Sequence, residues 1–147
     1  MASSKARVLL LDVNALVALA WPTHQFHVAV RQRLEHHPTQ KWATCLLTQL
    51  GFVRLSSNPA IVDPHQTPGQ AISLLRRLTA DEQHLYFDEL PRLASVEKTV
   101  LRLLGHQQVT DAYLVAVAEA NDATLLTLDR RLVATFVARD RVEVLTP

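Results

Sequence analysis

The most constraining feature of the sequence is an apolar run that ends in an aspartate. Residues 7–21 read RVLLLDVNALVALAW, in which the stretch Val8 to Leu11 is short, branched and uninterrupted before Asp12. Such a stretch is typical of a strand that is buried on both faces in a parallel sheet. A carboxylate at its end is costly to bury without partners. Asp12 is therefore expected either to serve a chemical site or to cap the next helix.

The rest of the chain alternates short apolar strands with amphipathic helices. Strands are predicted at residues 8–11, 41–44, 85–87, 124–128 and 142–145, and helices at residues 15–20, 24–36, 46–56, 95–104, 110–120 and 130–138, with a further helix starting at Thr67-Pro68. This alternation predicts an α/β fold with a mainly parallel sheet and helices on both faces. We expect one domain over residues 1–147, because no linker or repeat interrupts the pattern.

The cysteine count and the apolar runs indicate in which cellular compartment the protein is expected. The single cysteine, Cys45, excludes an intramolecular disulfide and a thiolate zinc site built by this chain alone, and it favours a reducing compartment. The apolar N-terminal stretch resembles a secretory signal, but Asp12 and Asn14 interrupt it. Other apolar runs fall short of the ~20 residues of a membrane-spanning helix. We therefore expect a soluble, cytoplasmic protein without a membrane segment.

Three aspartates are expected at one edge of the sheet. Asp12 follows the first strand, Asp129 follows the strand at 124–128, and Asp111 comes directly after Thr110, the predicted cap of its helix. In open parallel sheets the carboxyl ends of the strands share the edge where ligands bind. Carboxylates brought together there repel one another unless a cation compensates them, and oxygen ligands suit Mg²⁺ or Mn²⁺. The sequence thus predicts a divalent-cation site formed by these aspartates.

Each acid also has a structural interpretation, and these interpretations stay open. Asp12 is able to cap the following helix, and Asp111 is able to act as an ordinary first-turn acid that favours the helix dipole. Asp129 precedes Arg130-Arg131, with which it is able to form an exposed ion pair of little energetic weight.

Other site chemistries find weaker support. The pairs His24/His27 and His36-His37 lack a third ligand at fixed spacing, which disfavours zinc. Only three glycines are present, without a serine elbow, a P-loop or a dinucleotide fingerprint. A haloacid-dehalogenase-type phosphatase also starts with a strand ending in aspartate, but it requires a second acid where this chain has Asn14. We rank that phosphatase class low.

Four segments together resemble one family. LLDVNALVALAW, WATCLLTQLGFVRLSSNP, QVTDAYLVAVAEAND and LLTLDRRL are similar to the PIN-domain ribonucleases, in particular to the VapC toxins of bacterial toxin–antitoxin pairs, including a variety common in mycobacteria. The resemblance extends from residue 8 to about residue 145. It implies a PIN-like sheet of four or five strands, a Mg²⁺- or Mn²⁺-dependent endoribonuclease acting on structured RNA such as tRNA or rRNA, a homodimer, and a VapB-type antitoxin that covers the site.

The same resemblance assigns roles to particular residues. Asp12, Asp111 and Asp129 match the family's first, third and fourth acids, whereas Gln49 stands where a glutamate is common. An amide oxygen can coordinate a cation or hold a water, but it is uncharged and cannot act as a base. We therefore expect one well-held ion and weaker occupancy of a second site. Asn14 matches a polar position that orients Asp12 or a water.

Charge is consistent with an RNA substrate without requiring one. Once the three site aspartates are set aside, 11 acidic residues remain against 15 basic ones. Candidate phosphate contacts are Lys41, Arg76, Arg77, Arg130 and Arg131. Aromatic residues make up only 5% of the chain, so base stacking is expected to contribute little. The alternative, motivated by Gln49, is a non-cleaving PIN domain that binds RNA or protein.

Overall fold

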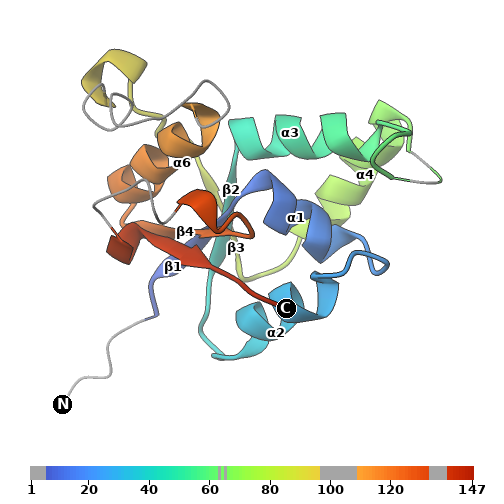
Figure 1. Cartoon of the computed structure of the whole chain (residues 1–147), viewed down its shortest axis with the longest axis horizontal. Helices are drawn as coiled ribbons and strands as arrows, with labels where there is room; N and C mark the ends of the chain where they lie inside the picture. The colour runs from blue at the N-terminus through green and yellow to red at the C-terminus, as the bar shows by residue number, and fades with distance from the viewer. Residues whose placement is uncertain (1–5, 63, 65, 97–108, 133–138) are drawn as a thin grey trace.

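A single parallel sheet organises the molecule. The computed structural model describes residues 6–62, 64, 66–96, 109–132 and 139–147. The strands are β1 (Val8–Leu11), β2 (Trp42–Cys45), β3 (His84–Phe87), β4 (Ala123–Thr127) and β5 (Val142–Val144). They lie in the order β3-β2-β1-β4-β5, and every neighbouring pair is parallel (Figure 1). The predicted α/β class and parallel sheet are confirmed.

Helices cover both faces of this sheet. They are α1 (Val13–Ala20), α2 (His27–Glu35), α3 (Leu46–Ser56), α4 (Pro68–Thr79) and α6 (Val109–Ala120), with short 3-10 helices η1 (Leu93–Val96) and η3 (Arg139–Arg141). α1 to α4 bury Leu16, Phe52 and Leu75 against one face, whereas α6 buries Leu114 and Val115 against the other. Figure 1 shows α6 on one side of the strands and α1, α3 and α4 on the other. The sheet is thus the middle of three layers.

The start of α4 follows directly from its sequence. The Thr67 hydroxyl accepts a hydrogen bond from the backbone N–H of Gln70 (3.2 Å), and the Gln70 side chain accepts one from the N–H of Thr67 (2.9 Å). Pro68 occupies the first helical position, where its missing N–H costs no hydrogen bond. The capping box predicted from Thr67-Pro68-Gly69-Gln70 is confirmed.

Several helix boundaries differ from the prediction. α1 begins at Val13, because the Asp12 side chain accepts a hydrogen bond from the Val13 N–H and caps the helix two residues early. α2 begins at His27, because the preceding residues form a turn in which His24 Nδ1 accepts from the N–H of Phe26 (3.1 Å). Thr110 does not cap α6, since Val109 is already helical.

Two predicted helices extend beyond the described residues. The helix expected at residues 95–104 overlaps η1, which ends at Val96, and its remainder lies outside the described ranges. The helix expected at residues 130–138 is described only as far as Leu132, where residues 131 and 132 are helical. Within the described ranges, no helix is long and apolar enough to cross a membrane.

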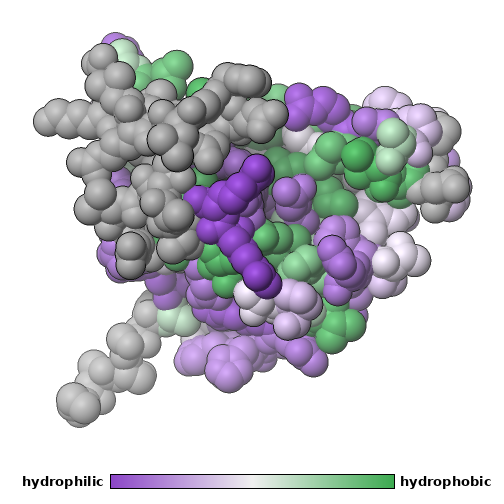
Figure 2. All heavy atoms as spheres, in the orientation of Figure 1, coloured by the Kyte–Doolittle hydropathy of each residue, from purple (hydrophilic) through white to green (hydrophobic). Residues whose placement is uncertain are grey.

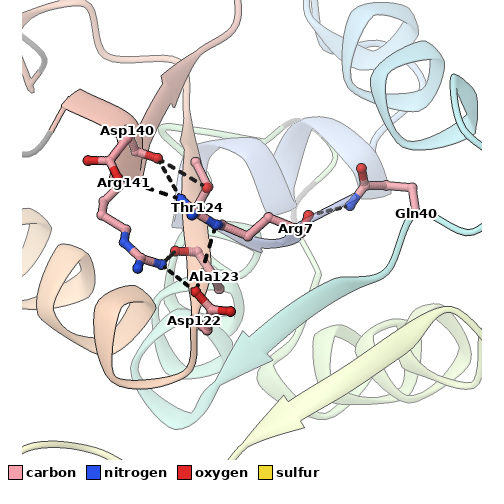
Figure 3. Close-up of polar contacts among 7 residues, drawn as sticks. All are labelled: Arg7, Gln40, Asp122, Ala123, Thr124, Asp140 and Arg141. Carbon is pink, nitrogen blue, oxygen red and sulfur yellow. Dashed lines mark hydrogen bonds and ion pairs between the residues drawn. The ribbon is translucent and has the colours of Figure 1, made fainter. Parts of the chain in front are cut away.

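A polar network joins the amino-terminal edge of the sheet (Figure 3). The guanidinium of Arg7, just before β1, donates to the carbonyl oxygen of Asp140 (3.1 Å), and Arg141 donates to the carboxylate of Asp122 (3.1 Å). The side chain of Gln40 donates to the carbonyl oxygen of Arg7 (2.9 Å). These contacts connect the beginnings of β1, β4 and β5. Asp12 and Asp129 lie beyond the opposite, carboxyl ends of β1 and β4.

Candidate active site

The strand order creates a crevice between β1 and β4. From β1 the chain proceeds to β2 and β3 on one side, then crosses to β4 on the other side of β1. Loops leaving the carboxyl ends of β1 and β4 therefore diverge, which is the arrangement that opens a ligand site in parallel sheets. Leu11 and Leu126 are paired across these strands, and Asp12 donates its N–H to the carbonyl oxygen of Leu126 (2.9 Å). Asp12 consequently lies at the switch point.

Asp12 is buried and held by two hydrogen bonds. Its side chain is buried, with the residue only 4% exposed. Oδ1 accepts from the Val13 N–H (2.6 Å), and Oδ2 accepts from the Thr127 hydroxyl (2.8 Å). Burial raises the pKa of Asp12, the nearby charge of Asp129 raises it further, and the two hydrogen bonds oppose the increase. Asp12 thus caps α1 and also faces the other acids.

Asp111 shares this electrostatic environment. It lies in the first turn of α6. Its pKa is raised from 3.8 to about 6, first by burial and then by the negative charges of Asp12 and Asp129, while Arg131 lowers it. Like charges act strongly only at short range in a partly buried site. The fold therefore brings Asp12, Asp111 and Asp129 into one interacting group.

Asp129 is fixed by the turn that follows β4. Its N–H donates to the Thr127 hydroxyl oxygen (3.1 Å), so the same hydroxyl joins Asp12 and Asp129. Oδ1 of Asp129 accepts from the backbone N–H (3.0 Å) and from Nε (3.1 Å) of Arg131, and Oδ2 accepts from Nη2 (3.1 Å). These hydrogen bonds from Arg131 lower the pKa of Asp129. Asp129 therefore stays ionised beside two acids whose pKa values are raised.

The two amide residues predicted for the site lie in different settings. Gln49, half-buried on α3, donates from Nε2 to the Thr44 hydroxyl (3.0 Å), and that hydroxyl lies 2.8 Å from Nε2 of His84. Its described hydrogen bond thus points toward β2 and β3. Asn14 is exposed on α1 and lines a groove described below. A role for Gln49 or Asn14 at the cation remains a prediction.

Comparison with known proteins identifies the family. A family model described as the PIN domain matches residues 9–136. The chain belongs to the PIN-domain family. It is 35% identical over 137 residues to "Ribonuclease VapC39" of Mycobacterium tuberculosis, which covers 92% of this chain and 98% of that protein. It is 37% identical over 139 residues to "Ribonuclease VapC38" of the same species, with 93% and 97% covered. These relatives match the sequence-based resemblance.

Solved PIN-fold structures share the architecture. VapBC2 from Rickettsia felis, bound to a DNA fragment from its promoter, superimposes with a TM-score of 0.60 at 14% identity, covering 95% of this chain and 99% of that chain. Mycobacterium tuberculosis VapC20, titled a sarcin-ricin loop cleaving toxin, gives a TM-score of 0.60 at 13% identity, with 90% and 98% covered. At such low identity these structures support the fold.

The donor set of this PIN domain fits a hard divalent cation. The carboxylates of Asp12, Asp111 and Asp129 repel one another, and Asp12 is also buried and Asp111 partly buried. Ionising all three is therefore costly unless a positive charge compensates them, and carboxylate oxygens are ligands that a hard divalent cation accepts. In the part of the chain that the structure describes, no three His, Cys, Asp or Glu side chains are already arranged as a cation site. Both carboxylate oxygens of Asp129 accept hydrogen bonds from the guanidinium of Arg131. A cation would have to draw Asp129 away from that arginine.

The ion pair of Asp129, which the sequence left open as an interpretation, is formed with Arg131. One further feature near the site was missed by sequence reasoning. The hydrogen-bonded set of Gln49, Thr44 and His84 joins α3, β2 and β3. Its only sequence signal is Thr44, a polar residue between apolar neighbours in β2, all of which the structure buries.

Proposed function

We propose that this chain is a metal-dependent endoribonuclease toxin of the VapC type, acting in the cytoplasm on structured RNA such as tRNA or rRNA. The observation that carries the proposal is the group of Asp12, Asp111 and Asp129 at the switch point, where Asp111 has a pKa of about 6. Relatives named VapC ribonucleases at 35–37% identity support the reaction class. Mg²⁺ or Mn²⁺ is the cation class that an all-oxygen donor set favours.

The three aspartates would hold the cation. When bound, the cation supplies positive charge to the scissile phosphodiester and polarises the attacking water. The Val13 N–H and the Thr127 hydroxyl hold both oxygens of Asp12, which fixes the direction of its remaining lone pairs. Thr127 also sets the separation of Asp12 from Asp129. Without a cation in the site, Asp111 takes up a proton more readily than an ordinary aspartate, because its pKa is raised to about 6.

Backbone contacts are expected to dominate RNA binding. Arg130 and Arg131 are exposed next to Asp129, so they lie at the rim of the candidate site. Arg76 and Arg77 are exposed in the last turn of α4. Lys41 is a poorer candidate, because it precedes β2 at the opposite edge of the sheet and donates to the carbonyl oxygen of Glu82 (3.3 Å). We propose that Arg130 and Arg131 contact phosphates nearest the cut.

A VapB-type antitoxin is the proposed inhibitory partner. A groove of 580 Å³ begins at Asn14, two residues from Asp12, and continues between α1 and the segment after α3, where its apolar walls include Trp21, Leu55 and Ile61. Figure 2 shows green, apolar surface over the region of α3 and α4. An antitoxin segment in this groove would contact Asn14, which lies two residues after Asp12 in the sequence. The solved structures of VapBC2 from Rickettsia felis and FitAcB from Neisseria gonorrhoeae, which share this fold, support such a partner.

A homodimer is proposed through a separate apolar face. A pocket of 350 Å³ beside the start of α6 is lined by Leu90, Leu93 and Val109, which are exposed hydrophobic side chains. Leu46 and Leu50 of α3 are also exposed. Exposed apolar side chains of this size in one region are typical of association surfaces. Leu93→Glu is expected to convert the dimer to a monomer, measured by light scattering during size-exclusion chromatography.

The function is tested by mapping new RNA 5′ ends. Purified wild-type protein and Asp12→Asn are incubated with total RNA in Mg²⁺, Mn²⁺ or EDTA; asparagine keeps an oxygen that can accept from the Val13 N–H. Asp88→Asn, which changes an exposed acid after β3, is the matched control. Discrete cuts by the wild type and the control, but not by Asp12→Asn or in EDTA, support the proposal. RNA that is bound but uncut supports the non-cleaving alternative.

A further inference from the structure

The contact between Arg131 and Asp129 engages the whole carboxylate. Nε and Nη2 of the guanidinium lie 3.1 Å from Oδ1 and Oδ2, respectively, which is the two-point geometry that arginine forms with carboxylates. The arginine side chain is 75% exposed and the aspartate side chain 21% exposed. Arg131 is therefore the solvent-accessible partner of this pair. Asp129 remains anchored in the site.

Positioning of Asp129 does not require this guanidinium. The N–H of Asp129 donates to the Thr127 hydroxyl oxygen (3.1 Å), and the backbone N–H of Arg131 donates to Oδ1 (3.0 Å). Both contacts persist when the side chain of residue 131 is shortened or neutralised. What the guanidinium adds is positive charge on both oxygens of one proposed cation ligand. Its charge also lowers the pKa of Asp111, so it compensates more than one acid.

We propose that Arg131 is a built-in counter-ion that occupies Asp129 until a divalent cation displaces it. The inference rests on the proposed function, because it assumes that Asp129 is a cation ligand. Cation binding then requires an exchange in which Asp129 gives up the guanidinium and gains the metal ion. The displaced guanidinium stays at the rim of the site, where an RNA phosphate is its complementary partner.

The exchange predicts a specific effect on metal affinity. Removing the guanidinium removes a competitor for Asp129, so Arg131→Gln is expected to bind Mn²⁺ about three- to fivefold more tightly, the upper part of the range for an exposed ion pair, because this pair has two-point geometry. Arg131→Lys keeps the charge but loses the two-point contact, so its Mn²⁺ affinity is expected to lie between those of the wild type and Arg131→Gln. Arg130→Gln removes the same charge one residue away and is expected to change the affinity less than twofold.

Isothermal titration with MnCl₂ measures these affinities on the full chain, and thermal unfolding in EDTA checks that each variant is folded. Tighter binding confined to residue 131 supports the exchange. Equal tightening in Arg130→Gln and Arg131→Gln would mean that only long-range charge matters, which overturns it. Unchanged or weaker binding by Arg131→Gln overturns it as well. Absence of Mn²⁺ binding in the wild type refutes the metal site and, with it, the inference.

Discussion

Replacing Asp111 with asparagine is expected to stabilise the cation-free protein. The pKa of Asp111 is raised from 3.8 to about 6, mainly by burial and then by Asp12 and Asp129. A shift of about two units corresponds to about 3 kcal/mol of penalty for the ionised form at neutral pH. Because the side chain is only partly buried, solvent screening reduces this to about 1–2 kcal/mol. Loss of a favourable first-turn charge on α6 removes about 0.5 kcal/mol of the gain.

The pH dependence of this gain has a defined sign. Between about pH 3.8 and pH 6 the folded protein holds more protons at Asp111 than the unfolded chain does, so wild-type stability decreases as pH rises. The advantage of Asp111→Asn is therefore complete above about pH 6 and absent below about pH 3.8. Urea unfolding in EDTA at several pH values measures it, with Asp88→Asn as the exposed control.

Added Mn²⁺ is expected to reverse the order of stability. At one hundred times the dissociation constant, a ligand that binds only the folded state adds about 2.7 kcal/mol. The wild type gains this stabilisation, whereas Asp111→Asn lacks a ligand and gains less. An asparagine variant that is less stable than wild type in EDTA at pH 7.5 would refute the account of burial and charge repulsion at Asp111.

Three further changes test the packing, the hydroxyl bridge and a strained turn. Gly51→Ala would place a Cβ 2.6 Å from a side-chain atom of α1 and should cost about 1–3 kcal/mol in urea unfolding, whereas Gly69→Ala, with nothing within 4 Å, should not destabilise. Thr127→Val removes the hydrogen bond to Asp12, so it should reduce RNA cleavage. Thr127→Ser keeps the hydroxyl and should retain cleavage. Equal cleavage by the two variants would exclude a role for this hydroxyl in the activity. Asp122 has a φ of 50°, a left-handed conformation that asparagine tolerates better than alanine. Asp122→Ala should therefore lose about 1 kcal/mol more stability than Asp122→Asn in thermal unfolding. Equal losses of stability in the two variants would mean that the lost charge, and not the backbone conformation, is the cause.

The sheet could be predicted because its strands have a strong local signature. The run Val8 to Leu11 is apolar on both faces, and β1 has the predicted bounds. The parallel orientation of the strands then follows from strand–helix alternation. Placing Asp12 and Asp129 at one edge needs only that orientation, whereas the strand order that makes β1 and β4 neighbours came from the structure. The geometry of the carboxyl ends was therefore available from sequence.

The directions of particular side chains could not be predicted in the same way. Gln49 bonds to Thr44 because the hydroxyl of that residue lies between α3 and β3, which is a tertiary arrangement without a local sequence signature. Asp12 caps α1, as one of the two interpretations of the sequence expected, while its second oxygen accepts from Thr127 at the end of β4, a tertiary contact without a local sequence signature. The two-point contact of the Arg131 guanidinium with Asp129 depends on the backbone turn after β4. Sequence indicated an ion pair between Asp129 and the following arginines, but not which arginine forms it or its two-point geometry.

The central claim is that Asp12, Asp111 and Asp129 bind one hard divalent cation. Anomalous diffraction from crystals grown in saturating Mn²⁺ tests it most directly. We expect one strong manganese peak with oxygens of all three side chains as ligands and with Arg131 moved off Asp129. A map without a peak among these carboxylates, with Arg131 still paired to Asp129, would contradict the account.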